Sequence, residues 1–268
     1  MTSAQRIIKI CAIALAILLA LGIIASLLSA LFALAGWLDN DSITGEMKQY
    51  PLQETVTSLE LELSAARLEI LTGEELTVES NLLDLTVREK NGKLSVIEKK
   101  RPRFVNQTDA IVKLTLPETF AAEEVEITAG AGSVQIAALT AKTLEMELGA
   151  GQLEIDTLCV TESGSIEGGA GQITIRGGEL SNLDFDLGVG EVSLACELLG
   201  TTKLECGIGE VSLTLPSLRE AYSFTLEKGI GEITLNGESV SSNSYGTGDS
   251  KIEIAGGIGK IAIVCAAP

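Results

Sequence analysis

The sequence predicts an all-β protein, a parallel β-solenoid (β-helix) of coils about 19–20 residues long, preceded by one transmembrane α-helix. Three observations lead to this fold class. A Gly-x-Gly unit recurs seven times after residue 129, apolar and polar residues alternate on both sides of each unit, and a long uncharged segment stands near the N-terminus. A recurring spacing near this length is typical of solenoids, and period-two alternation indicates strands with one buried face.

Residues 10–38 form an uncharged run of 29 residues, long enough for a helix to cross the ~30 Å hydrocarbon core with tilt. Arg6 and Lys9 precede the run and acidic residues follow it, so residues 1–9 are expected in the cytoplasm and the body outside the cell. The alternative is a signal peptide cleaved near Ala35, although such peptides have apolar regions of only ~7–15 residues. We expect a single-pass protein of the cell membrane that contacts lipid through residues 10–38, followed by a short linker over residues 39–52.

The repeat consists of Gly-x-Gly followed by an alternating run, as in Gly207-Ile-Gly-Glu-Val-Ser-Leu213. The first glycines follow one another at steps of 19, 20, 19, 19, 22 and 28 residues. We expect fourteen glycines to form structural corners: Gly130, Gly132, Gly149, Gly151, Gly169, Gly171, Gly188, Gly190, Gly207, Gly209, Gly229, Gly231, Gly257 and Gly259.

A change of parity supports the corner interpretation. In the second unit the apolar residues before the second glycine occupy even positions from Leu144 to Ala150, whereas those after it are Leu153 and Ile155. One residue is inserted there, as in a bulge or bend, and glycine accepts the backbone angles that a bend needs. The middle residues are expected to form a column that points inward: Ala131, Ala150, Ala170, Val189, Ile208, Ile230 and Ile258.

Two competing interpretations of Gly-x-Gly fail on their context. A dinucleotide or phosphate loop requires a helix after the glycines, and here a strand pattern follows every time. The calcium-binding nonapeptide repeat requires an Asp two residues after the last glycine, and this chain has Val, Leu or Ile there, as at Val192.

The expected solenoid covers residues 53–268, with irregular coils over 53–120 and regular Gly-x-Gly coils over 121–268. Ser64-Ala-Ala66 resembles a degenerate unit that has lost its glycines. The irregular coils are expected to cap the stack, because an exposed strand edge invites aggregation. Residues 236–250 are expected to form a surface loop, which is either plain variation or a binding segment.

Composition excludes several functions. There is no His, aromatic residues make up 3%, and 37 acidic residues stand against 19 basic ones, for a net charge of −18. Nucleic acid is therefore excluded as a partner, because this acidic chain and a nucleic acid are both polyanions and repel each other. His-based catalytic and metal sites are impossible, and no cofactor is expected.

Three groups of residues are candidates for chemistry or binding. Outward carboxylates recur on successive coils and form either a charged, soluble face or weak Ca²⁺ sites: Glu145, Glu147, Glu154, Asp184, Asp186, Glu205, Glu227 and Glu253. Four cysteines of the body, at 159, 196, 206 and 265, are expected as mostly buried free thiols, although disulfides of an exported protein stay open. Lys99–Arg103 is a basic cluster, either a solvated loop or a contact for lipid headgroups or an anionic polymer.

An apolar anchor, the sequence Leu114-Thr-Leu-Pro117 and the repeated Gly-x-Gly units together resemble a bacterial domain family of unknown function that is labelled "putative adhesin". The resemblance covers roughly residues 55–268. It implies a β-solenoid at the cell surface and supplies no catalytic residue.

The expected function is therefore that of a non-catalytic, adhesin-like interaction or scaffold module, whose partner is an unidentified protein or envelope polymer. The alternative is an accessory regulator of envelope stress that contacts a membrane partner. A polysaccharide-acting β-helix enzyme is a remote third possibility, since it would need clustered carboxylates beside basic and aromatic residues.

Overall fold

The computed structural model describes residues 44–53, 55–99 and 109–266, all of which belong to one compact unit. This part of the chain is all-β, as expected, with one short 3₁₀ turn, η1 (Arg219–Ala221). The predicted cytoplasmic segment 1–9 and anchor 10–38 lie outside the described residues. Across the ranges that are described, no helix combines the length and apolar character needed to cross a membrane.

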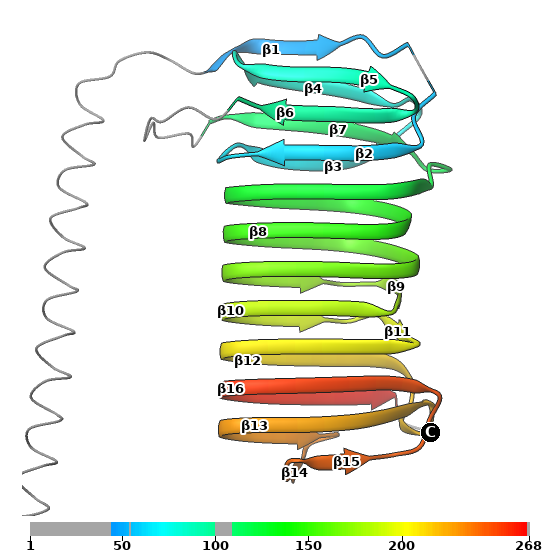
Figure 1. The fold of residues 1–268 in the computed structure, drawn as a ribbon, viewed down its shortest axis with the longest axis vertical. Helices are drawn as coiled ribbons and strands as arrows, with labels where there is room; N and C mark the ends of the chain where they lie inside the picture. Colours follow the sequence, from blue (N-terminus) through cyan, green and yellow to red (C-terminus); the bar gives the residue numbers. More distant parts are fainter. Residues whose placement is uncertain (1–43, 54, 100–108, 267–268) are drawn as a thin grey trace, which may run out of the picture. The chain divides into compact units, whose positions relative to one another are not determined.

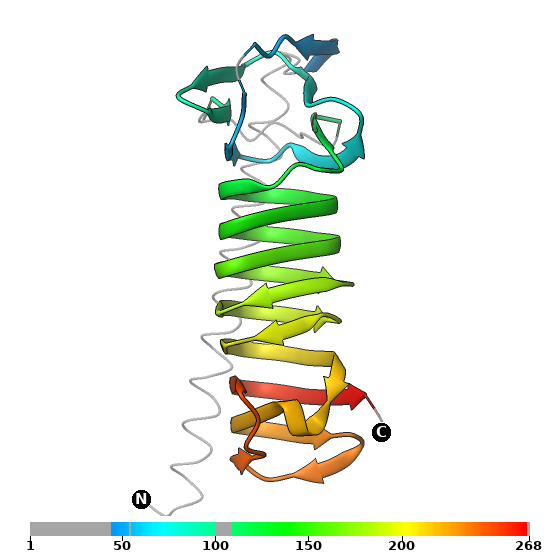
Figure 2. The same ribbon diagram turned by 90° about the vertical axis from the view of Figure 1, so that its right-hand side faces the viewer.

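Sixteen strands form one sheet that winds through stacked coils (Figures 1 and 2). Their bounds are β1 Thr44–Tyr50, β2 Ser58–Leu63, β3 Arg67–Gly73, β4 Thr77–Leu82, β5 Leu85–Lys90, β6 Lys93–Glu98, β7 Ile111–Pro117, β8 Ala122–Ile175, β9 Gly178–Ser181, β10 Leu183–Leu194, β11 Glu197–Leu199, β12 Thr201–Leu218, β13 Tyr222–Leu235, β14 Glu238–Val240, β15 Asn243–Tyr245 and β16 Ser250–Ala266.

The regular coils stack in parallel and in register. β10 pairs with β8 on one side and with β12 on the other, so that equivalent residues such as Val192 and Val211 lie directly opposite. A shorter ladder of β8, β9 and β11 adds a further side to the coils. Inward residues at alternate positions, including Phe185 and Leu204, are fully buried. The apolar alternation in the sequence thus becomes one continuous core.

The N-terminal coils are only partly solenoidal. β2 and β3 form a true coil with Ser64–Ala66 as its corner, because the Ala131 N–H donates a 2.8 Å hydrogen bond to the Ser64 carbonyl. Beyond this coil, β1–β4, β4–β7 and β5–β6 pair antiparallel. The Glu98 carboxylate accepts hydrogen bonds from the Ser64 and Ala65 N–H groups. These backbone groups therefore find a partner at the point where the parallel stack ends.

The expected linker over residues 39–52 is wrong from Thr44 onward, because Thr44–Tyr50 form β1. Five of its seven residues are exposed, so the sequence of this strand lacks the apolar alternation that predicts a strand. Its backbone hydrogen-bonds to β4 and covers an edge that would otherwise stay unpaired.

The C-terminal coils do not stack in chain order. β16 lies between β12 and β13, in parallel register with both, so the seventh Gly-x-Gly unit sits between the fifth and the sixth (Figure 1). The chain leaves β12, passes η1 and builds β13 one level further on. It then returns through β14 and β15 to fill the vacant level with its last strand. The lengthened steps of 22 and 28 residues correspond to these two crossings.

Residues 236–250 are not simply a loop. They contain β14 and β15, and each pairs antiparallel with β13. Asn236 and Gly237 have φ angles of 50° and 82°, as in the two-residue type I′ turn of a β-hairpin. Asn91 and Gly92 adopt the same conformation between β5 and β6. The dipeptide Asn-Gly was the local signal for both hairpins.

Candidate interaction edge

The fourteen glycines predicted as corners lie at one edge of the stack, where β2 ends and β3 begins (Figure 1). The second glycine of every unit has a φ between 146° and 151°. A Cβ at Gly190 would overlap with the Gly171 carbonyl oxygen, and one at Gly209 would overlap with that of Gly190. Glycine is required here by its backbone conformation and by the close approach of the neighbouring coil. We call the edge formed by these glycines and by the residue between each pair of them the corner edge.

The middle residues of the units do not point inward, which corrects the prediction from parity. Val189, Ile208 and Ile258 are 49%, 50% and 51% exposed, and Ile230 is 72% exposed. The bend takes both glycines and the residue between them out of the strand alternation, so the middle side chain projects from the corner. Its apolar character is therefore not explained by burial in the core.

These four side chains form a single file. Val189 lies opposite Ile208, Ile208 opposite Ile258, and Ile258 opposite Ile230. Glycines flank every one of them along the chain, so the residues directly before and after them have no side chain to cover them. We call Val189, Ile208, Ile258 and Ile230 the apolar ridge. The file continues through Ala170 beside Val189, and the exposed Ala131 and Ala150 occupy the same place in earlier coils.

A row of carboxylates runs beside the corner edge, on the strand segments that lead into the corner glycines. Asp186 lies opposite Glu167 and Glu205. Asp186, Glu167 and Glu147 line a surface groove of about 560 Å³. Within the described ranges, no group of three or more acidic, Cys or His side chains has the geometry to hold a metal ion. Weak Ca²⁺ binding along this row stays a prediction.

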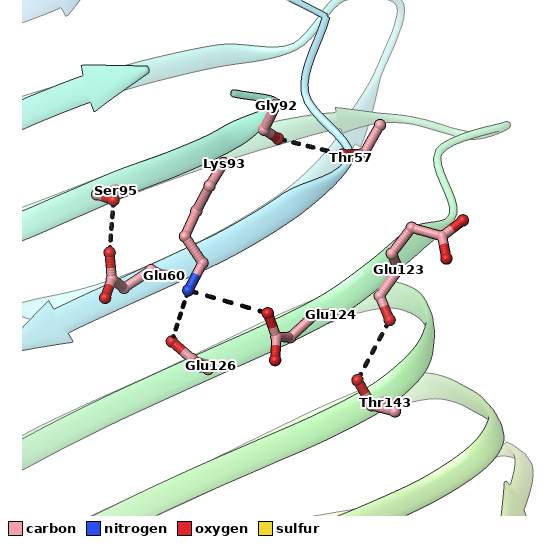
Figure 3. A network of polar contacts seen from close by, with 9 residues as sticks. All are labelled: Thr57, Glu60, Gly92, Lys93, Ser95, Glu123, Glu124, Glu126 and Thr143. Carbon is pink, nitrogen blue, oxygen red and sulfur yellow. Dashed lines mark hydrogen bonds and ion pairs between the residues drawn. The ribbon is translucent and has the colours of Figure 1, made fainter. Parts of the chain in front are cut away.

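Acidic residues in and beside the N-terminal coils have cationic or hydroxyl partners (Figure 3). The Lys93 ammonium lies 3.0 Å from Glu126 and 3.9 Å from Glu124, and the Ser95 hydroxyl donates to Glu60. The hydrogen bond to Glu126 raises the pKa of Lys93 above its ordinary value. Lys93 therefore offsets part of the acidic charge in this region, whereas Glu167, Asp186 and Glu205 lie directly beside one another.

The side chains closest to an enzyme-like arrangement line a second groove, of about 380 Å³. There Arg176 lies 3.1 Å from Glu154 and 2.9 Å from Asp156, with Glu69 also in the lining. The guanidinium is bound to both carboxylates, and all three side chains are exposed. No aromatic residue lines this groove. A platform on which a sugar ring could stack is thus missing from its walls.

The cysteines of the described region are free thiols, and Cys196, Cys206 and Cys265 are buried as expected, whereas Cys159 is half-buried. Burial raises the pKa of the Cys196 thiol to about 12, with a smaller contribution from Glu197. These buried thiols are core residues. The basic cluster 99–103 has only Lys99, which is exposed, within the described ranges, so its remaining residues are not placed.

The geometry defines a class of protein: an all-β stack of in-register parallel coils with an exposed apolar file along one edge. The chain belongs to the DUF4097 family, described as Toastrack, whose profile matches residues 53–255. This confirms the resemblance to a domain family of unknown function.

Several solved structures are similar. A "putative cell adhesion protein" from Clostridium sporogenes ATCC 15579 is 17% identical, with a TM-score of 0.32 over 82% of this chain and 99% of that chain. A "putative adhesin" from Parabacteroides merdae ATCC 43184 is 11% identical, with a TM-score of 0.40 over 83% and 96%. Another from Bacteroides fragilis NCTC 9343 is 13% identical, with a TM-score of 0.38 over 81% and 96%. Among curated proteins, no significant match was found.

Proposed function

We propose that this protein is a non-catalytic interaction module, anchored in the cell membrane by residues 10–38 and acting at the extracytoplasmic surface. The observation that carries the proposal is the repetition of the outer surface. Ser193 and Ser212 lie opposite each other, as do Glu191 and Glu210, at the ~4.8 Å spacing of neighbouring strands. A surface of in-register rows suits an extended partner, whereas small-molecule sites are concave and built from a few converging polar groups.

The length of the tether favours a partner close to the membrane. Because β1 begins at Thr44, only residues 39–43 separate the predicted anchor from the first strand. Five extended residues reach at most about 17 Å. Such a body stays near the bilayer, which suits a regulator that docks on a membrane protein and is less suited to adhesion across a thick wall.

In-cell crosslinking of the tagged full-length protein, followed by identification of what is captured, tests this function. A photocrosslinker at Ser193 or Ser212 samples the repeated face, and the chain lacking residues 39–268 is the control. Capture of one integral membrane protein that depends on the body supports the membrane-proximal module. Capture only of wall polymer or external glycoprotein supports the adhesin-like module instead. Turnover of an envelope polysaccharide by the purified protein would contradict a non-catalytic role.

A further inference from the structure

Exposed apolar side chains are concentrated on the corner edge. Nine large hydrophobic side chains are exposed within the described residues, and four of them form the apolar ridge. A fifth, Leu83, is 51% exposed and follows the last residue of β4. The strand pairing places it on the same edge. β4 runs antiparallel to β7, which runs parallel to β3 from the corner outward, so β4 ends at the corner.

The chain also enters the body on this edge. Thr44, the first residue of β1, lies opposite Leu82 at the end of β4. A Cβ at Gly45 would contact the Leu83 side chain, so the start of β1 and Leu83 are neighbours. In Figure 1, β1 begins on the side where β2 reaches its corner. The five residues that lead back to the predicted anchor therefore start from the edge that bears the apolar ridge.

The polar groups near the ridge leave its tips uncovered. On one flank the nearest outward row contains Asp186 and Glu205. On the other flank the row contains Glu210 and Lys260, whose ammonium lies 3.4 Å from the Glu210 carboxylate. Glycines stand between the ridge and both rows, so the side chains of the ridge project between a row with carboxylates and a row that contains both carboxylates and Lys260. This arrangement places apolar groups at the crest with charges on either side, and the apolar groups are the part that a shallow contact with a lipid interface would bury.

We propose that the corner edge lies on the lipid bilayer, with the apolar ridge inserted among the headgroups of the leaflet from which the anchor emerges. This inference rests on the proposed membrane anchoring. A tether at Thr44 holds the N-terminal end of the corner edge near the bilayer. The apolar ridge supplies a second contact toward the C-terminal end of the stack. A single file of four side chains is far smaller than the about 20–30 residues a side of a stable protein interface, which favours lipid over a protein partner.

Lipid depth quenching in the full-length protein tests the proposal. The chain contains one tryptophan, Trp37, which a Trp37→Phe change removes. Into this background we would place Ile208→Trp on the ridge and, separately, Val264→Trp as the matched control. Val264 is also 50% exposed but lies beyond the corner, opposite Thr214. The proteins are reconstituted in phosphatidylcholine vesicles that carry brominated acyl chains.

We expect a blue-shifted emission from residue 208 and quenching about threefold stronger than at residue 264, because insertion reaches ~5–10 Å into the interface. Replacing Ile258 and Ile230 by Ser in the Ile208→Trp protein should remove most of this difference while a urea unfolding curve shows that the body remains folded.

Equal quenching at the two positions overturns the inference. So does a photocrosslinker at Ile208 that captures protein in cells while residue 208 stays unquenched in vesicles, since the ridge is then a protein-docking surface. Carbonate extraction of cell membranes tests the anchor separately. A full-length chain that washes off contradicts the proposed anchoring. A chain that stays in the membrane with residue 208 unquenched contradicts only the contact of the ridge.

Discussion

At the scale of single residues, the second glycine of each unit is the position that the fold constrains most. Its φ near 150° and its contact with the carbonyl of the neighbouring coil act together, and both were implied by the recurrence of glycine at one spacing. The recurrence did not indicate whether the side chain between the two glycines points inward or outward. An apolar residue in an alternating pattern is normally buried, and only the exposure of Ile208 in the structure shows that its side chain points outward.

Gly209→Ala should destabilise the protein by more than about 2 kcal/mol, because the new methyl group overlaps with the Gly190 carbonyl as well as requiring an unfavourable φ. Gly237→Ala is the control, since Gly237 also has a positive φ but nothing lies within 4 Å of its Cβ position. Urea unfolding of the two variants measures the difference. Equal losses of stability would mean that the contact between coils is unimportant.

The buried thiols should resist alkylation in the folded protein. Cys196 is 2% exposed and its pKa is raised to about 12, so almost no thiolate exists at pH 8. We expect iodoacetamide to modify the half-buried Cys159 first, and Cys196 only after unfolding, as measured by peptide mass spectrometry. Rapid labelling of Cys196 in the native protein would contradict this core assignment.

Alkaline pH should destabilise the fold through the buried Cys196 thiol and the buried Tyr222 hydroxyl. Cys196 binds its proton more tightly in the folded state, so its contribution is complete below pH 9 and is lost as the pH rises toward about 12. Tyr222 acts in the same direction above pH 10, because burial and its 2.6 Å hydrogen bond to Glu197 raise the pKa of its hydroxyl. Cys196→Ala should flatten the lower part of this decline in unfolding curves measured from pH 8 to 11.

At the scale of elements, the strands were predictable where alternation and glycine spacing coincide, from β8 to β13. The order of the last coils was not, because seven similar repeats contain nothing that specifies which neighbours pair. β1 was not predictable either, since an edge strand with exposed side chains leaves no apolar pattern. The hairpin β13–β14 was predictable from Asn236-Gly237 alone.

Paired cysteines test the insertion of β16. Ser212 and Ala262 lie opposite each other in neighbouring strands, so Ser212→Cys with Ala262→Cys should form a disulfide on oxidation. Ser212→Cys with Thr234→Cys should not, because β16 separates these positions by two strand spacings, or about 9.6 Å, beyond disulfide reach. The opposite result, read on a non-reducing gel, would mean that the coils stack in chain order.

At the scale of the whole molecule, the acidic surface opposes folding through charge repulsion, whereas the extensive apolar core favours it. The chain carries a net charge of −18, and acidic side chains such as Glu167, Asp186 and Glu205 stand directly opposite one another. Their repulsion opposes folding but keeps exposed sheet faces from associating.

Added salt should therefore stabilise the protein, since it screens repulsion between exposed charges. Asp186→Asn should raise the free energy of unfolding by roughly 0.5 kcal/mol at low ionic strength and weaken its dependence on salt. Glu154→Gln is the matched control, because Glu154 is paired with Arg176 and its loss should give no gain. A stability that is independent of salt would contradict the role of the carboxylate row.

The position of β16 also has a consequence for biosynthesis. The segment that fills the level between β12 and β13 follows both strands in the chain, so it leaves the ribosome after them and, on the proposed topology, crosses the membrane after them. Until it arrives, two parallel edges remain open, and a chain that stops at residue 249 can never close them. Closure of the stack therefore requires that synthesis and export have passed Ala266, and we expect a chain truncated at residue 249 to be cleaved by proteases faster than one with the closed stack.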